Sequence, residues 1–174
     1  LELGCGSALP GIYCLKYQNC ETVFQDYNED VIKMVTIPNV GLNLSFSKGE
    51  KLTNLDDVPV NRNQLIAESK TQFISGDWSK MDNLNTGNQA FDLILTSETI
   101  YSASSHQQLL NAMAQNLRPD GIALVAAKTT YFGCSGSLAM FLRQAEQHCR
   151  VQQIECLLTV SDAGVRREIV MLRF

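Results

Sequence analysis

Short apolar segments alternate with longer amphipathic ones along most of this chain, and this alternation predicts strands separated by helices. Segments of strand length end at residue 3 and cover residues 22–25, 72–75, 91–97, 122–127, 153–160 and 168–174. Amphipathic helices are expected at residues 10–17, from residue 29 onward, from residue 104 or 105 to residue 117, and at residues 137–149. Such alternation is typical of parallel strands joined by right-handed helical crossovers.

The end of the chain breaks this alternation, because its last two strands follow each other without a helix between them. That connection requires an antiparallel hairpin in an otherwise parallel sheet. Segment 91–97 is apolar throughout its middle, as expected of a central parallel strand. We therefore predict an α/β fold, a Rossmann-like seven-stranded sheet with helices on both faces and a C-terminal antiparallel hairpin, in a single domain over residues 1–174.

The helix that follows Asn28 carries two local signals. Asn28 is a residue type that caps helix N-termini, and Pro38 is expected to kink the helix or to split it in two. The predicted apolar stripe of this helix is Val31, Ile32, Val35 and Val40.

Two polar stretches interrupt the pattern. Residues 45–70 lose the apolar periodicity and predict a long surface loop or insertion, which is either tolerated or used for substrate docking. Residues 118–121, Arg-Pro-Asp-Gly, predict a turn. Because Leu1 stands directly before a glycine turn, we also expect the domain to be truncated, with a further segment upstream of residue 1.

Composition narrows the functional classes. The 174 residues are 45% hydrophobic with a net charge of −4, which fits one globular domain and argues against a dedicated nucleic-acid surface. No apolar run is long enough to span a membrane. The six cysteines form no C-x-x-C pair, so we expect no metal site and reduced thiols in a cytoplasmic or nuclear protein. His106 and His148 are expected on helix surfaces.

The first eleven residues, LELGCGSALPG, predict a strand, a glycine turn and a helix, the arrangement of a nucleotide-binding crossover. Gly4 and Gly6 let the backbone approach a ligand closely. Leu9 stands where a dinucleotide-binding motif needs a third glycine, which disfavours an NAD-dependent dehydrogenase. The acidic Glu2 beside the turn suits a ligand with positive charge, such as the ammonium and sulfonium of S-adenosylmethionine.

Polar residues follow four predicted strands, and in an open parallel sheet ligands lie over these carboxyl ends. The marked strand ends are Glu2/Gly4/Gly6, Asp26/Tyr27/Asn28, Gly76/Asp77/Trp78 and Ser97/Glu98. Asp26 is placed to bind a ribose diol, or alternatively to cap a helix. Asp77 would accept from an adenine amino group, and Trp78 would stack on the ring or belong to the core. Ser97 and Glu98 would line the floor beneath the methyl donor.

These motifs resemble a known family. LELGCG is similar to the glycine motif of seven-stranded methyltransferases, and FQDYN, SGDWS, DLILTSETIY and KTTYFGCSG resemble the histidine protein methyltransferases, which modify a histidine of a large-subunit ribosomal protein. The resemblance implies S-adenosylmethionine as cofactor, with contacts at Gly4, Gln25 to Asn28, Gly76 to Trp78 and Ser97. It also implies a ribosomal protein partner. Related lysine methyltransferases share the architecture, so a lysine acceptor stays open, as does a catalytically silent binding domain.

The acceptor chemistry needs little acid–base assistance, because an imidazole with a pKa of about 6.5 is mostly neutral at pH 7. A group that accepts the other ring N–H would fix the tautomer, and Glu98 is our candidate. Tyr101 would form a second wall of the acceptor site or hydrogen-bond the acceptor ring. Tyr131 and Phe132 either flank the acceptor ring or pack, and we favour packing. We expect a monomer that acts without direct contact with nucleic acid or membrane.

Overall fold

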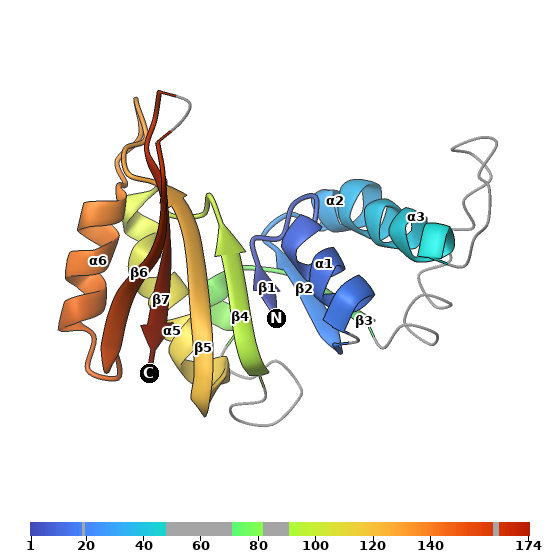
Figure 1. Ribbon diagram of the computed structural model, residues 1–174, viewed down its shortest axis with the longest axis horizontal. Coiled ribbons are helices and arrows are strands. Elements are labelled where there is room, and N and C mark those ends of the chain that lie inside the picture. Colours follow the sequence, from blue (N-terminus) through green and yellow to red (C-terminus); the bar gives the residue numbers. More distant parts are fainter. Residues whose placement is uncertain (19, 48–70, 82–90, 162–163) are drawn as a thin grey trace. The chain divides into compact units, whose positions relative to one another are not determined.

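The computed structural model describes residues 1–18, 20–47, 71–81, 91–161 and 164–174 (Figure 1). The chain divides into two compact units, Leu1–Gly76 and Asp77–Phe174, and each is described by itself. Among the described residues, no helix has the length and apolar character needed to cross a membrane.

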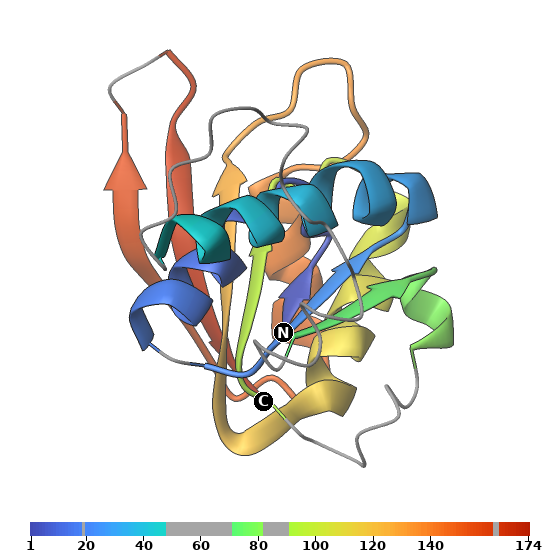
Figure 2. The same ribbon diagram turned by 90° about the vertical axis from the view of Figure 1, so that its right-hand side faces the viewer.

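The N-terminal unit is a three-stranded parallel sheet with helices packed on it. Its strands are β1 (Glu2–Leu3), β2 (Thr22–Asp26) and β3 (Thr71–Ser75), in the order β3-β2-β1. Its helices are α1 (Leu9–Gln18), α2 (Glu29–Val31), the π-helical turn η1 (Ile32–Thr36) and α3 (Ile37–Ser47). Figure 2 shows α1 and the α2–η1–α3 helix on the same side of these strands. The predicted strand–helix alternation is thus observed in this unit.

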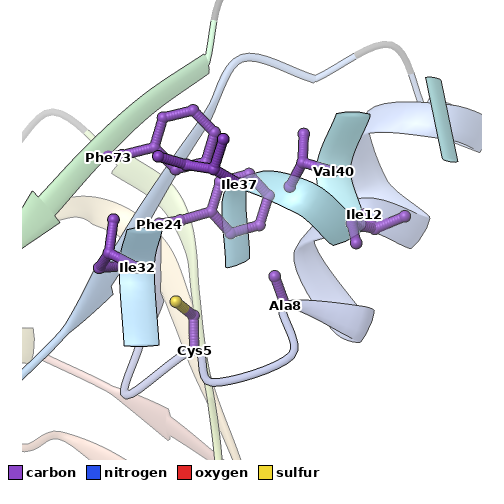
Figure 3. Packing of buried hydrophobic residues seen from close by; sticks show 8 residues of the cluster. All are labelled: Cys5, Ala8, Ile12, Phe24, Ile32, Ile37, Val40 and Phe73. Carbon is purple, nitrogen blue, oxygen red and sulfur yellow. The ribbon is translucent and has the colours of Figure 1, made fainter. Parts of the chain in front are cut away.

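The core of this unit lies between the two helices and the strands (Figure 3). The rings of Phe24 on β2 and Phe73 on β3 stack with centroids 5.6 Å apart. Around these rings lie the side chains of Cys5, Ala8, Ile12, Ile32, Ile37 and Val40. Burial of this apolar surface is what fixes both helices on the sheet.

The stripe predicted for the second helix is wrong at one position. Val35 is 39% exposed, whereas Thr36 and Ile37 are buried. The reason is η1, where the N–H of Ile37 donates to the carbonyl of Ile32, five residues earlier. The wide turn adds one residue and shifts the buried face by one position. It ends at Thr36, two residues before Pro38, whose ring would clash with a carbonyl four residues earlier in a regular α-helix.

The C-terminal unit is a mixed sheet with helices, and its described residues are 77–81, 91–161 and 164–174. Its strands are β4 (Phe91–Ser97), β5 (Leu117–Lys128), β6 (Gln153–Val160) and β7 (Arg167–Arg173), in the order β4-β5-β7-β6. Strands β4 and β5 are parallel, while β7 runs antiparallel to both β5 and β6. The expected C-terminal hairpin is confirmed.

Among the described residues, this unit also contains the short 3-10 turns η3 (Trp78–Lys80) and η4 (Ala103–Ser105), and the helices α5 (His106–Asn116) and α6 (Leu138–Gln147). The apolar face predicted for α5 is buried as expected, with Leu109, Leu110 and Met113 fully covered. His106 lies on the same face and is completely buried, so its predicted surface position is wrong. Its ring meets that of Phe141 on α6 edge-on, with centroids 5.5 Å apart.

The structure also bears on the predicted turn at residues 118–121 and the predicted loop at residues 45–70. Residues 118–121 are not a separate turn, because β5 begins at Leu117, which pairs with Phe91, and regular pairing resumes where Ile122 faces Leu93. The intervening residues form a bulge opposite Asp92. Of the loop predicted at residues 45–70, the first three residues end α3, and residues 48–70 lie outside the described residues.

We predict that Gly11→Ala destabilises the protein by about 1–3 kcal/mol, as overpacking of a well-packed site does. A Cβ at position 11 would collide with the Phe24 ring and lie 2.6 Å from Glu2 Oε2. Urea denaturation measures the change. Gln18→Ala, at the exposed end of the same helix, is the control, with a change within about 0.5 kcal/mol. Equal stability of Gly11→Ala and the native protein would contradict this packing.

Candidate functional site

The glycine loop, residues Gly4 to Gly6, joins β1 to α1, and side chains of β2 hold its backbone. The N–H of Gly4 donates to Gln25 Oε1 at 3.2 Å, and the N–H of Gly6 donates to Asp26 Oδ2 at 3.0 Å. Both glycines have positive φ, at 63° and 48°, so their amides turn toward β2 without the steric cost that a Cβ would bring. The two residues at the end of β2 therefore shape the loop.

Gln25 links the loop to the third strand as well. Its side chain is fully buried, and Nε2 donates to the carbonyl of Gly76 at 2.8 Å. The N–H of Gly76 in turn donates to the carbonyl of Asp26 at 3.0 Å. Because a buried amide is stable only when it is hydrogen-bonded, Gln25 fixes the ends of β1, β2 and β3 relative to one another.

Two residues of the neighbouring helix hold the same loop from its other side. Thr36 Oγ1, at the end of η1, donates to the carbonyl of Gly6 at 2.8 Å, and Asn39 Nδ2 donates to the carbonyl of Ser7 at 3.0 Å. Sequence reasoning missed both residues. The signal for Thr36 was its spacing, because it stands four residues after Ile32 and four before Val40 and so shares their buried face.

Both carboxylate oxygens of Asp26 accept backbone hydrogen bonds, and its contact with a ribose stays a prediction. Its Oδ1 accepts from the N–H of Asn28 at 3.0 Å, while Oδ2 holds Gly6. Each oxygen has a second lone pair available for a ligand hydroxyl. Asn28 stands at the helix N-cap but makes no side-chain capping bond. Tyr27 beside them is exposed.

The space over the loop suits a ligand that approaches the backbone. A Cβ built on Gly6 or Gly76 would meet no atom within 4 Å. The loop therefore has open space above it, with the carboxylate of Asp26 at its rim.

Glu2 is oriented differently from its neighbours in the motif. Its carboxylate is buried, and Oε2 accepts from the N–H of Gly11 on α1 at 2.8 Å. Burial raises the pKa of Glu2 to about 7, although the Gly11 bond opposes this rise. Glu2 thus holds α1 against β1, and its contact with a cationic ligand stays a prediction.

In the C-terminal unit, Glu98 directly follows β4 in a left-handed conformation, with φ of 57°. Its N–H donates to the carbonyl of Ala126 at 2.9 Å, which continues the β4–β5 ladder. Its Oε2 pairs with Lys128 Nζ at 3.0 Å, and both side chains are partly exposed. The strained backbone and the ion pair together orient one carboxylate at the end of β4.

Tyr131 is the third member of this group. It is half-buried and donates a hydrogen bond to Glu98, and its hydroxyl oxygen accepts from the N–H of Lys128 at 3.3 Å. The Lys128 ammonium lies 5.6 Å from the centre of the Tyr131 ring. Burial, followed by the nearby Glu98 charge, raises the pKa of Tyr131 to about 12, so it is a hydrogen-bond donor at neutral pH.

The segment after Glu98 is held by a buried histidine. His106 Nε2 lies 2.8 Å from the carbonyl of Ile100 and donates to it, since a carbonyl can only accept. Thr96 and Thr99 share a buried hydroxyl–hydroxyl bond of 2.7 Å. These contacts fix the backbone beside Tyr101, whose side chain is 53% exposed.

The remaining predicted residues have local partners. Asp77 Oδ1 caps η3 by accepting from the N–H of Ser79 at 2.8 Å, and this bond lowers the pKa of Asp77. Trp78 is half-buried on η3, which packs against α5. Ser97 is exposed at the end of β4.

The structure therefore assembles two groups. In the N-terminal unit, hydrogen bonds join Gly4, Gly6, Gln25, Asp26, Asn28 and Gly76. In the C-terminal unit, Glu98 is joined by Tyr131 and by Lys128, which sequence reasoning did not single out. The signal for Lys128 was its place at the end of β5, parallel to the strand that leads to Glu98.

Known structures with the same fold define the class. The chain aligns over 99% of its length with 79% of the PH0226 protein from Pyrococcus horikoshii, at a TM-score of 0.61 and 13% identity. It aligns equally far with 77% of a TehB-like SAM-dependent methyltransferase from Corynebacterium glutamicum, at a TM-score of 0.57 and 16% identity. The predicted fold class, the seven-stranded Rossmann-like sheet of class I methyltransferases, is confirmed.

A family model described as a methyltransferase domain matches residues 1–159, and the chain belongs to this family. Among curated relatives, the histidine protein methyltransferase 1 homolog of Dictyostelium discoideum is 40% identical over 81% of this chain and 38% of its own length. The homolog of Bos taurus is 37% identical over 100% of this chain and 48% of its own length. The resemblance to histidine protein methyltransferases is confirmed, and the chain spans about half the length of such relatives or less.

The raised pKa of Glu2 predicts a pH-dependent stability. In the folded protein Glu2 releases its proton at a pKa of about 7, whereas in the unfolded chain it does so near its ordinary value of 4.5. The stabilisation is therefore fully present below pH 4.5 and is lost as the pH rises through 7. We expect Glu2→Gln, which can still accept from Gly11, to remove this loss, which is on the order of 2 kcal/mol. Urea unfolding at pH 5 and pH 8 measures the difference, and equal pH dependence of both proteins would contradict it.

Proposed function

We propose that this chain is the catalytic domain of an S-adenosylmethionine-dependent protein methyltransferase that methylates an imidazole nitrogen of a histidine. The observation that carries the proposal is the glycine loop, whose amides are held by Gln25 and Asp26, in a chain that matches a methyltransferase family model over residues 1–159. The choice of histidine rests on the curated relatives.

For the cofactor, we propose that the N-terminal unit holds the nucleoside and amino acid parts along the glycine loop. Asp26 would accept from ribose hydroxyls with its remaining lone pairs, and the open space at Gly6 and Gly76 admits a ligand against the backbone. Gln25 and Thr36 would act through the loop that they hold. Tyr27, Asp77, Trp78 and Ser97 stay candidate contacts.

For the acceptor, we propose that Glu98 accepts the ring N–H opposite to the nitrogen that is methylated. S-adenosylmethionine supplies the methyl group, which the neutral nitrogen takes up as the carbon–sulfur bond breaks, and the resulting imidazolium then releases one proton. The carboxylate fixes the tautomer and stabilises the positive charge that develops on the ring. Lys128 and Tyr131 hold this carboxylate in place, and Tyr101 is the candidate for a second contact with the ring.

We propose a large-subunit ribosomal protein as substrate, on the family resemblance alone. The net charge of −4 is compatible with a basic protein partner and disfavours direct binding to nucleic acid. The six cysteines are free thiols, which supports a reducing compartment such as cytoplasm or nucleus. We propose a monomer that works without a membrane.

The product of the reaction tests this function. The full-length protein is incubated with methyl-labelled S-adenosylmethionine and purified large-subunit ribosomal proteins, and the hydrolysed product is analysed for labelled amino acids. We expect methylhistidine. Methyllysine would keep the fold and the cofactor but reassign the acceptor, and absence of label with intact cofactor binding would indicate a catalytically silent binding domain.

We predict that Asp26→Ala abolishes binding of S-adenosylmethionine, because it removes both the proposed ribose acceptor and the partner of the Gly6 amide. Isothermal titration calorimetry measures the affinity. Asp30→Ala removes an exposed carboxylate from the same unit and should leave the affinity unchanged. Unchanged affinity of Asp26→Ala would refute the proposed cofactor site.

We predict that Tyr131→Phe and Lys128→Met lower kcat roughly 10-fold to 100-fold with little change in KM, because a misplaced catalytic group loses rate by this order. Lys128→Arg should restore part of the rate by restoring the ion pair with Glu98. Steady-state methylation kinetics with purified ribosomal proteins measure both constants.

The matched control is Arg118→Gln. It removes the 2.6 Å ion pair with Asp92, which joins the same two strands at their opposite ends. Its kcat should equal that of the native protein. If it falls as far as that of Lys128→Met, the loss reflects a weaker β4–β5 pair instead of a misplaced Glu98.

A further inference from the structure

Phe132 has no packing role in the described part of the chain. Its side chain is 82% exposed, more than any other large hydrophobic residue of the described ranges. The preference for packing at this position was therefore wrong. An exposed phenyl ring is costly in water, and aromatic rings in this state are enriched where proteins bind partners.

The loop that carries Phe132, residues 130–137, is closed at its base and tied internally. Thr130 and Ser137 form an antiparallel bridge, and the N–H of Cys134 donates to the carbonyl of Tyr131 at 3.3 Å. A loop that is ordered before binding loses little conformational entropy when a partner docks. Phe132 is thus presented on a preformed surface.

The same loop is fixed to the segment that carries the acceptor-side residues. The N–H of Gly136 donates to the carbonyl of Tyr101 at 2.8 Å, and Ser135 Oγ accepts from the N–H of Ala103 at 3.1 Å. A Cβ at position 136 would collide with the carbonyl of Ile100, so the two backbones are in direct contact. At the other end of the loop, Tyr131 binds Glu98. Phe132 therefore lies between two attachments to the Glu98–Ala103 segment.

We propose that Phe132 is a docking residue for the acceptor protein, contacting an apolar side chain close to the histidine that is methylated. This inference rests on the proposed function. The loop surface takes an uncharged partner group, because residues 132–136 carry no charge, while nearby Glu98 is paired with Lys128 and Arg166 with Glu168. The contact is thus hydrophobic and insensitive to salt.

The proposal predicts that substitutions of the adjacent residues Phe132 and Tyr131 change different kinetic constants. Phe132→Ala should raise the apparent KM for purified large-subunit ribosomal proteins roughly 10-fold, as loss of an aromatic anchor does, while kcat and the affinity for S-adenosylmethionine stay unchanged. Tyr131→Phe should lower kcat instead. The increase in KM should be the same at 50 mM and 300 mM salt, and Phe132→Leu should restore most of the binding. These measurements use the full-length protein.

Leu157→Ala is the matched control, because Leu157 is an exposed apolar residue of the same unit, on β6. It should leave KM unchanged. An unchanged KM in Phe132→Ala would overturn the inference while leaving the function intact. A change of oligomeric state in Phe132→Ala, measured by light scattering, would also overturn it, because Phe132 would then contact a second copy.

Photo-crosslinking separates failure of the inference from failure of the function. A benzoyl-phenylalanine introduced in place of Phe132 should crosslink the ribosomal protein, and the same probe in place of Leu157 should not. If the native protein forms no methylhistidine but position 132 still crosslinks, the function fails and the docking role stands. If methylhistidine forms and position 132 does not crosslink, only the docking role fails.

Discussion

The N-terminal unit depends on two hydrogen bonds from backbone amides of the glycine loop to side chains of β2. The Gly4 amide donates to Gln25 and the Gly6 amide to Asp26. Neither side chain could stay at this strand end without such partners, because a buried amide or a partly buried carboxylate pays for its desolvation unless it is hydrogen-bonded. The same two side chains also bind the backbone at the end of β3, through Gly76, and at the start of the following helix, through Asn28.

The sequence predicts this fold well where a single physical demand acts on a segment. Residues 91–97 match β4 in full, because a parallel strand in the middle of a sheet must be apolar over its length. The predictions fail where a second demand intervenes. Accommodation of Pro38 inserts a π-helical turn that exposes Val35, and continued pairing with Phe91 draws residues 118–121 into β5. Neither effect can be seen in the local spacing of apolar residues.

The residues of the candidate site also fall into those that the sequence could identify and those that it could not. The pattern of polar residues at strand ends is enough to select Asp26 and Glu98, but not their partners, which come from other segments through tertiary contacts. His106 was within reach, because it precedes Leu109, Leu110 and Met113 at helical spacing and so shares their buried face. The burial of Thr36 could also have been predicted, since it stands at helical spacing between Ile32 and Val40, but its bond to Gly6 is a tertiary contact that the local sequence does not show.

Glu98 shows why the acceptor side is built as a network. A non-glycine residue in the left-handed region costs roughly 1–2 kcal/mol, and glycine at this position would avoid that cost. The strain persists because surrounding contacts over-determine it: Ala126 binds the backbone of Glu98, Lys128 and Tyr131 bind its carboxylate, and His106 holds the next turn at Ile100. Backbone strain that fixes one side-chain orientation is expected where the direction of a carboxylate matters as well as its charge. The loop that supplies Tyr131 also presents Phe132, so the order that aims Glu98 extends to the surface where an acceptor would dock.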